Sequence, residues 1–226
     1  MSVHLGKIVP FGRSRREYEL MFNLTEADCQ GRILGCGDGP ASFNAEMTKA
    51  GYSVTSIDPI YQFAGSEIKQ RFVETVDDII AQVKATPDDW VWSYHRDPED
   101  LRQHRTEALT KFLADYETGL AEGRYRLAAL PELPFADREF DLALCSHLLF
   151  LYSDLLSAEF HQRSILELCR VATEVRIFPL LTLSLKVSPH IESVRETLAE
   201  HGIQSEIATT DYELQKGGNQ MMRLFR

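Results

Sequence analysis

The sequence is poor in cysteine and contains no long apolar run. Among its 226 residues there are only four cysteines: Cys29, Cys36, Cys145 and Cys169. They form no C-x-x-C pair and show no metal-ligand spacing, which excludes a disulfide scaffold and a cysteine-based zinc module. A membrane-spanning helix needs roughly 20 consecutive apolar residues. The most apolar stretch, LALCSHLLFLYSDLL, is interrupted by Ser146, His147 and Asp154, so no membrane span is expected.

Positive charge is also in short supply. The chain carries 34 acidic and 24 basic side chains, a formal net charge of −10. A field of this sign opposes binding to phosphate backbones and to anionic bilayers. We therefore expect a small-molecule substrate, with no nucleic-acid and no membrane partner. The opening residues, MSVHLGKIVPFGR, contain no apolar signal-peptide core, which favours a cytoplasmic protein.

The length and the hydrophobic content of 44% suit one α/β domain with a sizeable core. We expect a single domain over residues 1–226 that carries a helical insertion at residues 62–123. The oligomeric state is left open.

The N-terminal third predicts a β-α-β unit. Ser14 and Glu17 have capping-box spacing and predict a helix that runs to about Phe22. A strand near residues 31–34, a helix over 40–50 and a strand ending at Asp58 follow, because a residue before proline is pushed out of helical geometry.

The insertion interrupts this alternation. Two helices are expected, one capped by Thr75 and one capped by Asp97 with Pro98 in its first turn. A single crossover helix would connect the flanking strands, so the surplus is interpreted as a lid that shapes a substrate site.

The β-α alternation then resumes. Strands are predicted at YRLAAL, FDLALC and EVRIFPL, with a helix from Ser157 to Arg170. Ser188 and Pro189 are predicted to open a last helix that closes at Gly202. The tail predicts an antiparallel hairpin around Gly217 and Gly218.

The stretch RILGCGDG is the most informative part of the sequence. After a buried strand, Gly35 permits a tight turn, Gly37 lets a ligand touch the backbone, and Gly39 allows close helix packing. The helix that follows offers unpaired amides to an anionic group. About 20 residues further on, Asp58 ends the next strand, where a carboxylate can bind a ribose diol. A nucleoside-containing ligand fits both features.

Two other interpretations remain open. A dinucleotide site would show G-x-G-x-x-G, whereas this chain has G-x-G-x-G followed by Pro40, so the spacing disfavours a nicotinamide cofactor. A tight strand-helix turn with Asp58 merely capping a loop requires no ligand at all.

Taken together, ILGCGDG, SIDP, LPELPFADREFDLALCSH and the terminal hairpin resemble class I S-adenosylmethionine-dependent methyltransferases. The resemblance covers residues 31–58 and about 124–226 and leaves the insertion unexplained. It implies a Rossmann-like, mostly parallel seven-stranded sheet flanked by helices, ordered 3-2-1-4-5-7-6 with the last strand antiparallel. It also implies S-adenosyl-L-methionine as cofactor.

By this resemblance, the cofactor lies at the carboxyl ends of the first strands. The three turn glycines with Cys36 would face its methionyl part, and Asp58 its ribose. Further cofactor contacts are implied for Pro59, Ile60, Leu130, Cys145, Ser146, Arg13 and Tyr18. Of these, Arg13 is a candidate partner for the cofactor's carboxylate, with a solvated arginine as the alternative.

The sequence departs from the family pattern at two positions. Ile33 stands where the family usually has an acid before the first glycine, and Ala129 stands where an acid often meets the adenine amino group. Losing one charge-assisted hydrogen bond costs about 1.5–3 kcal/mol, or roughly one to two decades of affinity. Asp38 and Glu46 are the candidates for compensation.

Catalytic residues are sought after the fourth strand, in CSHLLFLYSD. Methyl transfer requires alignment of a nucleophile and sometimes removal of a proton, and no metal is expected. His147 titrates near neutral pH and Tyr152 can donate a hydrogen bond, so both are candidates to receive or orient a substrate. Structural roles, a satisfied strand-end histidine and a packed tyrosine, are the alternatives.

Three aromatic residues in the insertion form a further candidate. Trp90, Trp92 and Tyr94 alternate along WVWSYH and predict either an aromatic substrate wall or lid-to-body packing.

We therefore expect an enzyme that transfers a methyl group from S-adenosylmethionine to a small or medium-sized acceptor. The acceptor and its accepting atom are not indicated. A non-catalytic cofactor-binding protein is the main rival, and an NAD(P)-dependent oxidoreductase is the weaker one.

Overall fold

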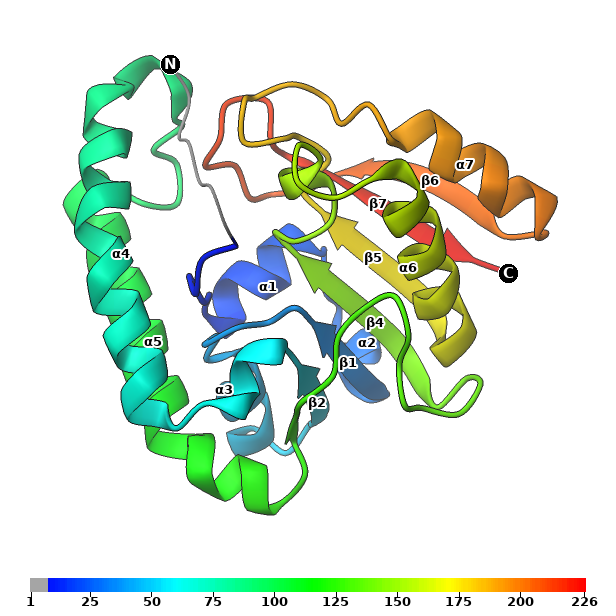
Figure 1. Ribbon diagram of the computed structural model, residues 1–226, viewed down its shortest axis with the longest axis horizontal. Helices are drawn as coiled ribbons and strands as arrows, with labels where there is room; N and C mark the ends of the chain where they lie inside the picture. Colours follow the sequence, from blue (N-terminus) through cyan, green and yellow to red (C-terminus); the bar gives the residue numbers. More distant parts are fainter. Residues whose placement is uncertain (1–7) are drawn as a thin grey trace.

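A computed structural model describes residues 8–226. Its centre is a seven-stranded sheet of order β3-β2-β1-β4-β5-β7-β6 (Figure 1), which confirms the predicted fold class. Neighbouring strands are parallel except at β7, which runs antiparallel to both β5 and β6. The strands are β1 (Arg32–Cys36), β2 (Ser53–Ile57), β3 (Tyr125–Arg126), β4 (Phe140–Ser146), β5 (Ala172–Phe178), β6 (Gln204–Thr209) and β7 (Gln220–Phe225).

Helices cover both faces of the sheet. They are α1 (Arg15–Met21), α2 (Glu26–Cys29), α3 (Phe43–Lys49), α4 (Gly65–Ala85), α5 (Pro98–Ala121), α6 (Ala158–Val171) and α7 (Ile191–Glu200). The helices α6 and α7 lie on one face, and α1 and α3 lie on the other (Figure 1).

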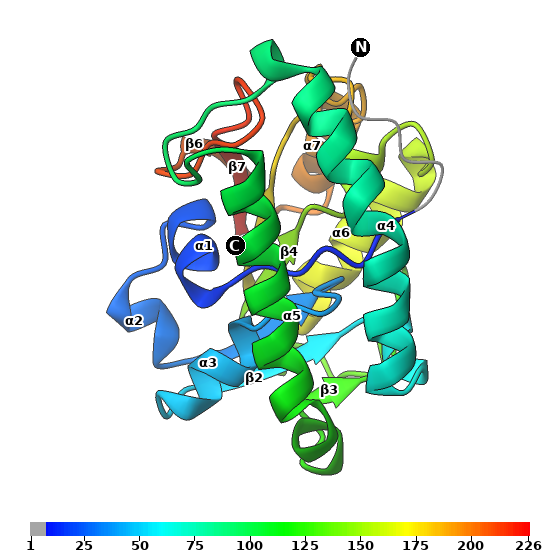
Figure 2. The ribbon, with the colours of Figure 1, turned by 90° about the vertical axis from the view of Figure 1, so that its left-hand side faces the viewer.

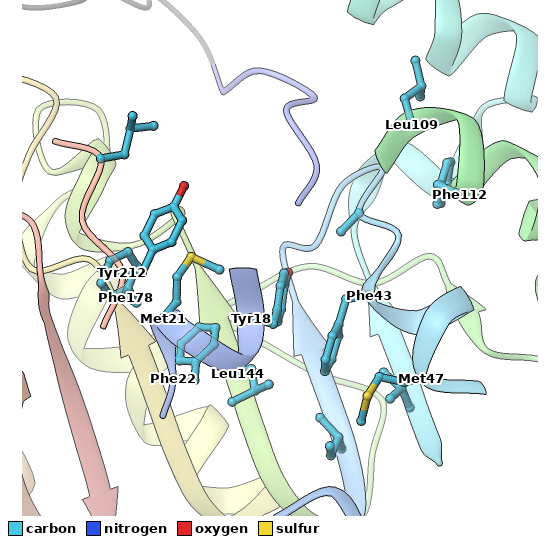
Figure 3. Packing of buried hydrophobic residues seen from close by; sticks show 14 of the residues in the cluster. Tyr18, Met21, Phe22, Phe43, Met47, Leu109, Phe112, Leu144, Phe178 and Tyr212 are labelled. Carbon is cyan, nitrogen blue, oxygen red and sulfur yellow. The ribbon is translucent and has the colours of Figure 1, made fainter. Parts of the chain in front are cut away.

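Alternating side chains of the central strands divide the core into two layers. Ile33 and Leu144 face the layer of α1 and α3, whereas Leu34 and Ala143 face the layer of α6 and α7. This follows from the two-residue period of a strand that is buried on both faces. In the first layer Tyr18 of α1 stacks on Phe43 of α3, with ring centroids 4.2 Å apart (Figure 3).

The insertion between β2 and β3 consists mainly of α4 and α5, which pack side by side along one edge of the molecule (Figure 2). Asp97 caps α5 as predicted, because its side chain accepts hydrogen bonds from the amides of Glu99 and Asp100. The predicted start of α4 at Thr75 is wrong, because the helix begins at Gly65. Within it, the Thr75 hydroxyl donates to a preceding carbonyl, that of Arg71, 3.0 Å away, a bond that lets threonine sit inside a helix.

Two of the three other predicted helix caps are confirmed. Ser14 and Glu17 form the predicted capping box, and Ser157 caps α6. Ser188 does not cap α7: its amide donates to the carbonyl of Leu180, which keeps it outside the helix, and the cap residue is His190.

The third strand is shorter than predicted. Only Tyr125 and Arg126 pair with β2, because β2 stops at Ile57 and offers no ladder partner beyond that point. The terminal hairpin of β6 and β7 is confirmed.

Candidate functional site

The glycine turn after β1 depends on Gly37, whereas the sequence assigned the tight turn to Gly35, which lies within β1. Gly37 has a φ of +68°, a region that side chains other than glycine rarely occupy. A Cβ on Gly37 would come within 2.6 Å of Leu148 Cδ2. The turn is tied to β2, because the Gly37 amide donates to the carbonyl of Ile57 over 2.9 Å.

Asp58 closes the turn from the neighbouring strand. Its Oδ2 accepts the amide of Gly39 at 2.9 Å, and its Oδ1 accepts the amide of Ile60 at 2.8 Å. Burial raises the pKa of Asp58, although the two hydrogen bonds lower it. Each carboxylate oxygen uses one acceptor site on the backbone and keeps further acceptor capacity.

Asp38 lies inside the same turn and is almost completely buried. Its Oδ1 accepts the hydroxyl of Tyr18 at 2.7 Å, and its Oδ2 accepts the hydroxyl of Ser56 at 2.5 Å. Burial raises the pKa of Asp38 to about 6 although both hydrogen bonds lower it. Asp38 therefore places a carboxyl group at this turn, although Ile33, at the position where the family usually has an acid, provides none.

These groups line a cavity of about 440 Å³ at the carboxyl ends of β1, β2 and β4, which we call the glycine-turn cavity. It lies at the sheet edge where open α/β sheets bind ligands. Most of the predicted cofactor residues line it: Arg13, Tyr18, Cys36, Gly37, Gly39, Asp58, Pro59, Ile60, Leu130 and Ser146.

Two predicted cofactor residues do not line this cavity. Gly35 lies in β1, where an added Cβ would overlap the carboxyl of Asp38 at 1.9 Å, so this glycine makes room for the acid rather than for a ligand. Cys145 is completely buried in the core. Glu46 also lies elsewhere and accepts hydrogen bonds from Ser42 and Lys111.

A second, smaller cavity of about 100 Å³ adjoins the first, and we call it the apolar cavity. Its walls come from the N-terminal segment, the insertion, the segments after β4 and β5, and the β6–β7 connection. Its apolar lining includes Val9, Phe11, Ile79, Val83, Trp90, Leu101, Leu151, Phe178, Leu183 and Leu214. Trp90 alone of the three aromatic residues in WVWSYH lines it, whereas Trp92 and Tyr94 pack against the core.

His147 lines both cavities. It has a φ of +51°, and its amide is held by the Phe178 carbonyl at 2.6 Å. The ring Nδ1 lies 3.0 Å from the Ser146 hydroxyl. Burial and then the charges of Arg13 and Arg105 hold the pKa of His147 well below its usual range. The imidazole is therefore neutral at pH 7, and burial and these two charges oppose its protonation.

Tyr152 lines the apolar cavity and not the glycine-turn cavity. Its hydroxyl oxygen accepts the amide of Val9 at 3.4 Å. Since this bond uses the oxygen as acceptor, the hydroxyl proton remains available for another group.

A buried ion pair forms part of the same region. Glu17 of α1 and Arg105 of α5 are fully buried and lie 2.7 Å apart at their closest atoms. The Tyr212 hydroxyl donates to Glu17 at 3.0 Å. Burial disfavours the Glu17 carboxylate, yet Arg105 holds its pKa well below the usual range. This charge pair is therefore ionised and mutually neutralised.

Arg13 has no such partner. Its Nη1 donates to the carbonyl of Phe11 at 2.9 Å, while its buried Nε lacks a hydrogen-bond partner among residues 8–226. No carboxylate within residues 8–226 lies at ion-pair distance from it. Burial and the neighbouring Arg105 lower the pKa of Arg13 to about 10. It lines both cavities and leaves an excess of positive charge where they meet.

The sequence did not single out Arg105 or Tyr212. Arg105 lies in a charged helical stretch typical of a solvated face, and Tyr212 lies in the connection of the hairpin. Glu17 was predicted only as a capping residue, a role that it also has. No local signal marks these three, because they meet from distant parts of the chain.

None of the helices described here is long and apolar enough to cross a membrane. No protein-family model matches the sequence.

Several solved structures resemble the chain. One is the magnesium protoporphyrin IX methyltransferase of Synechocystis PCC 6803, which was crystallised with bound SAM. It is 12% identical, with 88% of this chain and 71% of that chain covered and a TM-score of 0.45. Another is a SAM-dependent methyltransferase from Aquifex aeolicus, 11% identical, with 92% and 90% covered and a TM-score of 0.44. The Rossmann-like methyltransferase fold itself rests on the strand order described above.

One curated protein is considerably closer in sequence. It is 33% identical over 225 residues, which cover 99% of both chains, and it comes from Methanocaldococcus jannaschii. The chain belongs to the same family as this relative, the uncharacterized protein MJ0045.

Proposed function

We propose that the protein transfers a methyl group from S-adenosylmethionine to a small, largely apolar acceptor. The observation that carries this proposal is that the two cavities meet at His147. One cavity has the backbone and carboxylates suited to a nucleoside with a cationic group. The other has the apolar walls suited to an organic molecule.

The residues of the glycine-turn cavity fit the methyl donor. Gly37 and Gly39 line the cavity without a side chain, and Asp58 retains acceptor capacity for a ribose diol. Asp38 supplies negative charge for a cationic methionyl group, and the unpartnered Nε of Arg13 suits its carboxylate. When bound, the donor supplies a methyl carbon already activated by positive sulfur.

The apolar cavity is proposed to hold the acceptor. Apolar walls contributed by α4 and α5 exclude water and align the accepting atom with the glycine-turn cavity. His147 lies at the junction of the two cavities, so its unprotonated ring nitrogen is assigned the role of accepting a hydrogen bond or a proton from the acceptor. Tyr152 is assigned the role of orienting the acceptor through its hydroxyl proton.

Binding and transfer are tested separately. Calorimetry with S-adenosylmethionine, S-adenosylhomocysteine and NAD⁺ is expected to show binding of the first two and no binding of the third. Incubation with methyl-labelled donor and a low-molecular-weight cell extract is expected to transfer label only when the extract is present.

The two rivals predict different results. Binding without label transfer in any extract would favour a silent cofactor-binding protein, and binding of NAD⁺ alone would favour the oxidoreductase. If neither the donor nor its demethylated product binds, the proposal is wrong.

A further inference from the structure

Three metal-binding side chains gather at the start of α5, outside both cavities. Potential ligand atoms of His95, Asp100 and His104 all lie within 4.8 Å of one another. Asp100 and His104 are four residues apart on α5 and therefore share a helix face. His95 reaches them from the preceding loop. His95 and Asp100 are buried, and the side chain of His104 is 32% exposed.

The separations suit a metal after small side-chain movements. The two Nδ1 atoms lie 2.8 Å apart, and the His104 Nδ1 lies 4.0 Å from an Asp100 oxygen. With metal–ligand bonds of about 2.1 Å, ligands of a tetrahedral ion lie about 3.4 Å apart. The observed distances fall on either side of this value.

Contacts behind His95 orient its ring for ligation. Its Nε2 lies 3.2 Å from the Tyr212 hydroxyl and 3.5 Å from a carboxylate oxygen of Glu17. Arg105 Nη2 also lies 3.5 Å from this nitrogen, but its closer partner is Glu17 at 2.7 Å. With the proton of His95 on Nε2, that N–H faces the Glu17 carboxylate and the Tyr212 oxygen, and the lone pair is on Nδ1. In metal sites, a carboxylate that accepts the N–H of the non-ligating nitrogen commonly fixes the orientation of the histidine ring.

Without a metal, the two facing Nδ1 atoms share one proton. The lone pair on His95 requires His104 to donate across the 2.8 Å gap. A cation between the two rings takes the place of that proton and binds both Nδ1 atoms, and the proton of His104 moves to its Nε2, so that both histidines stay neutral.

The carboxylate of Asp100 can still bind a metal, although Arg96 donates hydrogen bonds to it. Arg96 donates from its guanidinium to Oδ1, and its amide donates to Oδ2 at 3.0 Å. Oδ2 therefore retains acceptor capacity. The other nearby cation, Arg105, is paired with Glu17.

We propose that His95, Asp100 and His104 form a binding site for a divalent first-row transition metal, with Zn²⁺ as the probe. Two imidazoles and one carboxylate suit Zn²⁺, Co²⁺ or Ni²⁺, whereas Mg²⁺ and Ca²⁺ prefer sites in which all ligand atoms are oxygens. The side chain of His104 is partly exposed, so water can supply a fourth ligand. The site is independent of the proposed methyl transfer.

A metal here would link the 90–97 loop to α5. Leu101 and Arg105 of this helix line the apolar cavity, so the ion would stiffen one wall of that cavity. Its role would be structural.

The test uses full-length, tag-free protein that has been stripped with a chelator. Calorimetry is expected to show one bound Zn²⁺ per chain, and Co²⁺ is expected to give the visible absorption bands of a site with nitrogen ligands. Zn²⁺ is expected to raise the thermal unfolding midpoint. His104→Ala and Asp100→Asn are expected to weaken binding by at least about 100-fold, the upper end of what loss of an outer partner costs a metal site.

His201→Ala is the matched control, since His201 is an exposed histidine at the end of α7. This variant is expected to bind like the wild type. Because His104 is partly exposed, its alanine variant is expected to fold, and unfolding of the metal-free variants checks this. Absence of Zn²⁺ and Co²⁺ binding to the wild type, or equal binding by His104→Ala, would overturn the proposal.

Discussion

The glycine-turn cavity and the apolar cavity are built in different ways. The first is formed largely by segments that follow β1, β2 and β4. Its two carboxyl groups, Asp38 and Asp58, are held by backbone amides and hydroxyls that lie between 2 and 20 positions away in the sequence. The second is assembled from segments along the whole chain, and its charges are held by each other, as in the pair of Glu17 and Arg105. The difference indicates that the strand ends of the sheet supply most of the first cavity, whereas the second depends on how distant segments pack together.

His147 belongs to both cavities, so its removal gives the largest expected effect. His147→Ala is expected to lower turnover by about 10²–10⁴-fold, the usual contribution of a general base. Affinity for S-adenosylhomocysteine is expected to be unchanged, because the contacts of Asp58 and Gly37 remain. Label transfer and calorimetry measure the two quantities. Unchanged turnover would remove His147 from the mechanism.

The ion pair behind the apolar cavity should matter for stability. Glu17→Gln leaves the buried guanidinium of Arg105 without its counter-charge, which is expected to lower the free energy of unfolding by about 3–5 kcal/mol. Glu19→Gln, on the same helix, is the control. Among residues 8–226, Glu19 pairs with Arg15 and Arg16 at the partly exposed surface, so its loss is expected to cost at most about 1 kcal/mol. Denaturant unfolding compares them, and equal losses would contradict the expected importance of the buried pair.

Replacement of Asp58 should affect only the binding of ligands in the glycine-turn cavity. Asp58→Ala removes the acceptor proposed for the ribose and is expected to weaken binding of both donor and product by about 10–100-fold. Asp211→Ala removes an equal charge from an exposed position and serves as the control. Calorimetry at fixed pH measures both. An unaltered affinity in Asp58→Ala would mean that Asp58 merely closes the turn.

The buried acid of the same turn gives the smallest expected effect, a dependence on pH. Since burial raises the pKa of Asp38 to about 6, this group is protonated below that pH in the free protein. The ammonium group that S-adenosylmethionine and S-adenosylhomocysteine share favours the carboxylate, so binding below this pH must release a proton. Affinity is therefore expected to fall by up to about tenfold per pH unit below about 6 and to level off above it.

Calorimetry with S-adenosylhomocysteine between pH 5 and 8 checks this dependence. Asp38→Asn retains Asp58 and is expected to show a weaker dependence on pH. Identical profiles for the variant and the wild type would exclude Asp38 as the titrating group.

Much of the fold was predictable, because many of the sequence patterns that indicate its helices and strands are local. Asp97 and Ser157 cap helices as predicted, and a glycine turn follows β1 as predicted. The error at Thr75 arose because a threonine before a charged, amphipathic stretch resembles a cap, whereas the apolar positions of α4 continue back to Ile68 and Phe72.

The candidate site was predictable only in part. Motifs that follow strands indicated Asp58 and His147, since parallel strands bring their carboxyl ends to one edge. Gly35 and Cys145 were included with them, but the side chain of Asp38 fills the space beside Gly35. No motif separates a residue that lines a cavity from its buried neighbour.

The sequence by itself determined the alternation of strands and helices, the bare turn and the acid that closes it, because each depends on residues close together in the chain. Tertiary structure alone decided what surrounds the second cavity. Glu17 meets Arg105 across 88 positions and Tyr212 across 195. Such pairings depend on how helices pack over the sheet, and a burial energy shared by many side chains, rather than any local pattern, selects that packing.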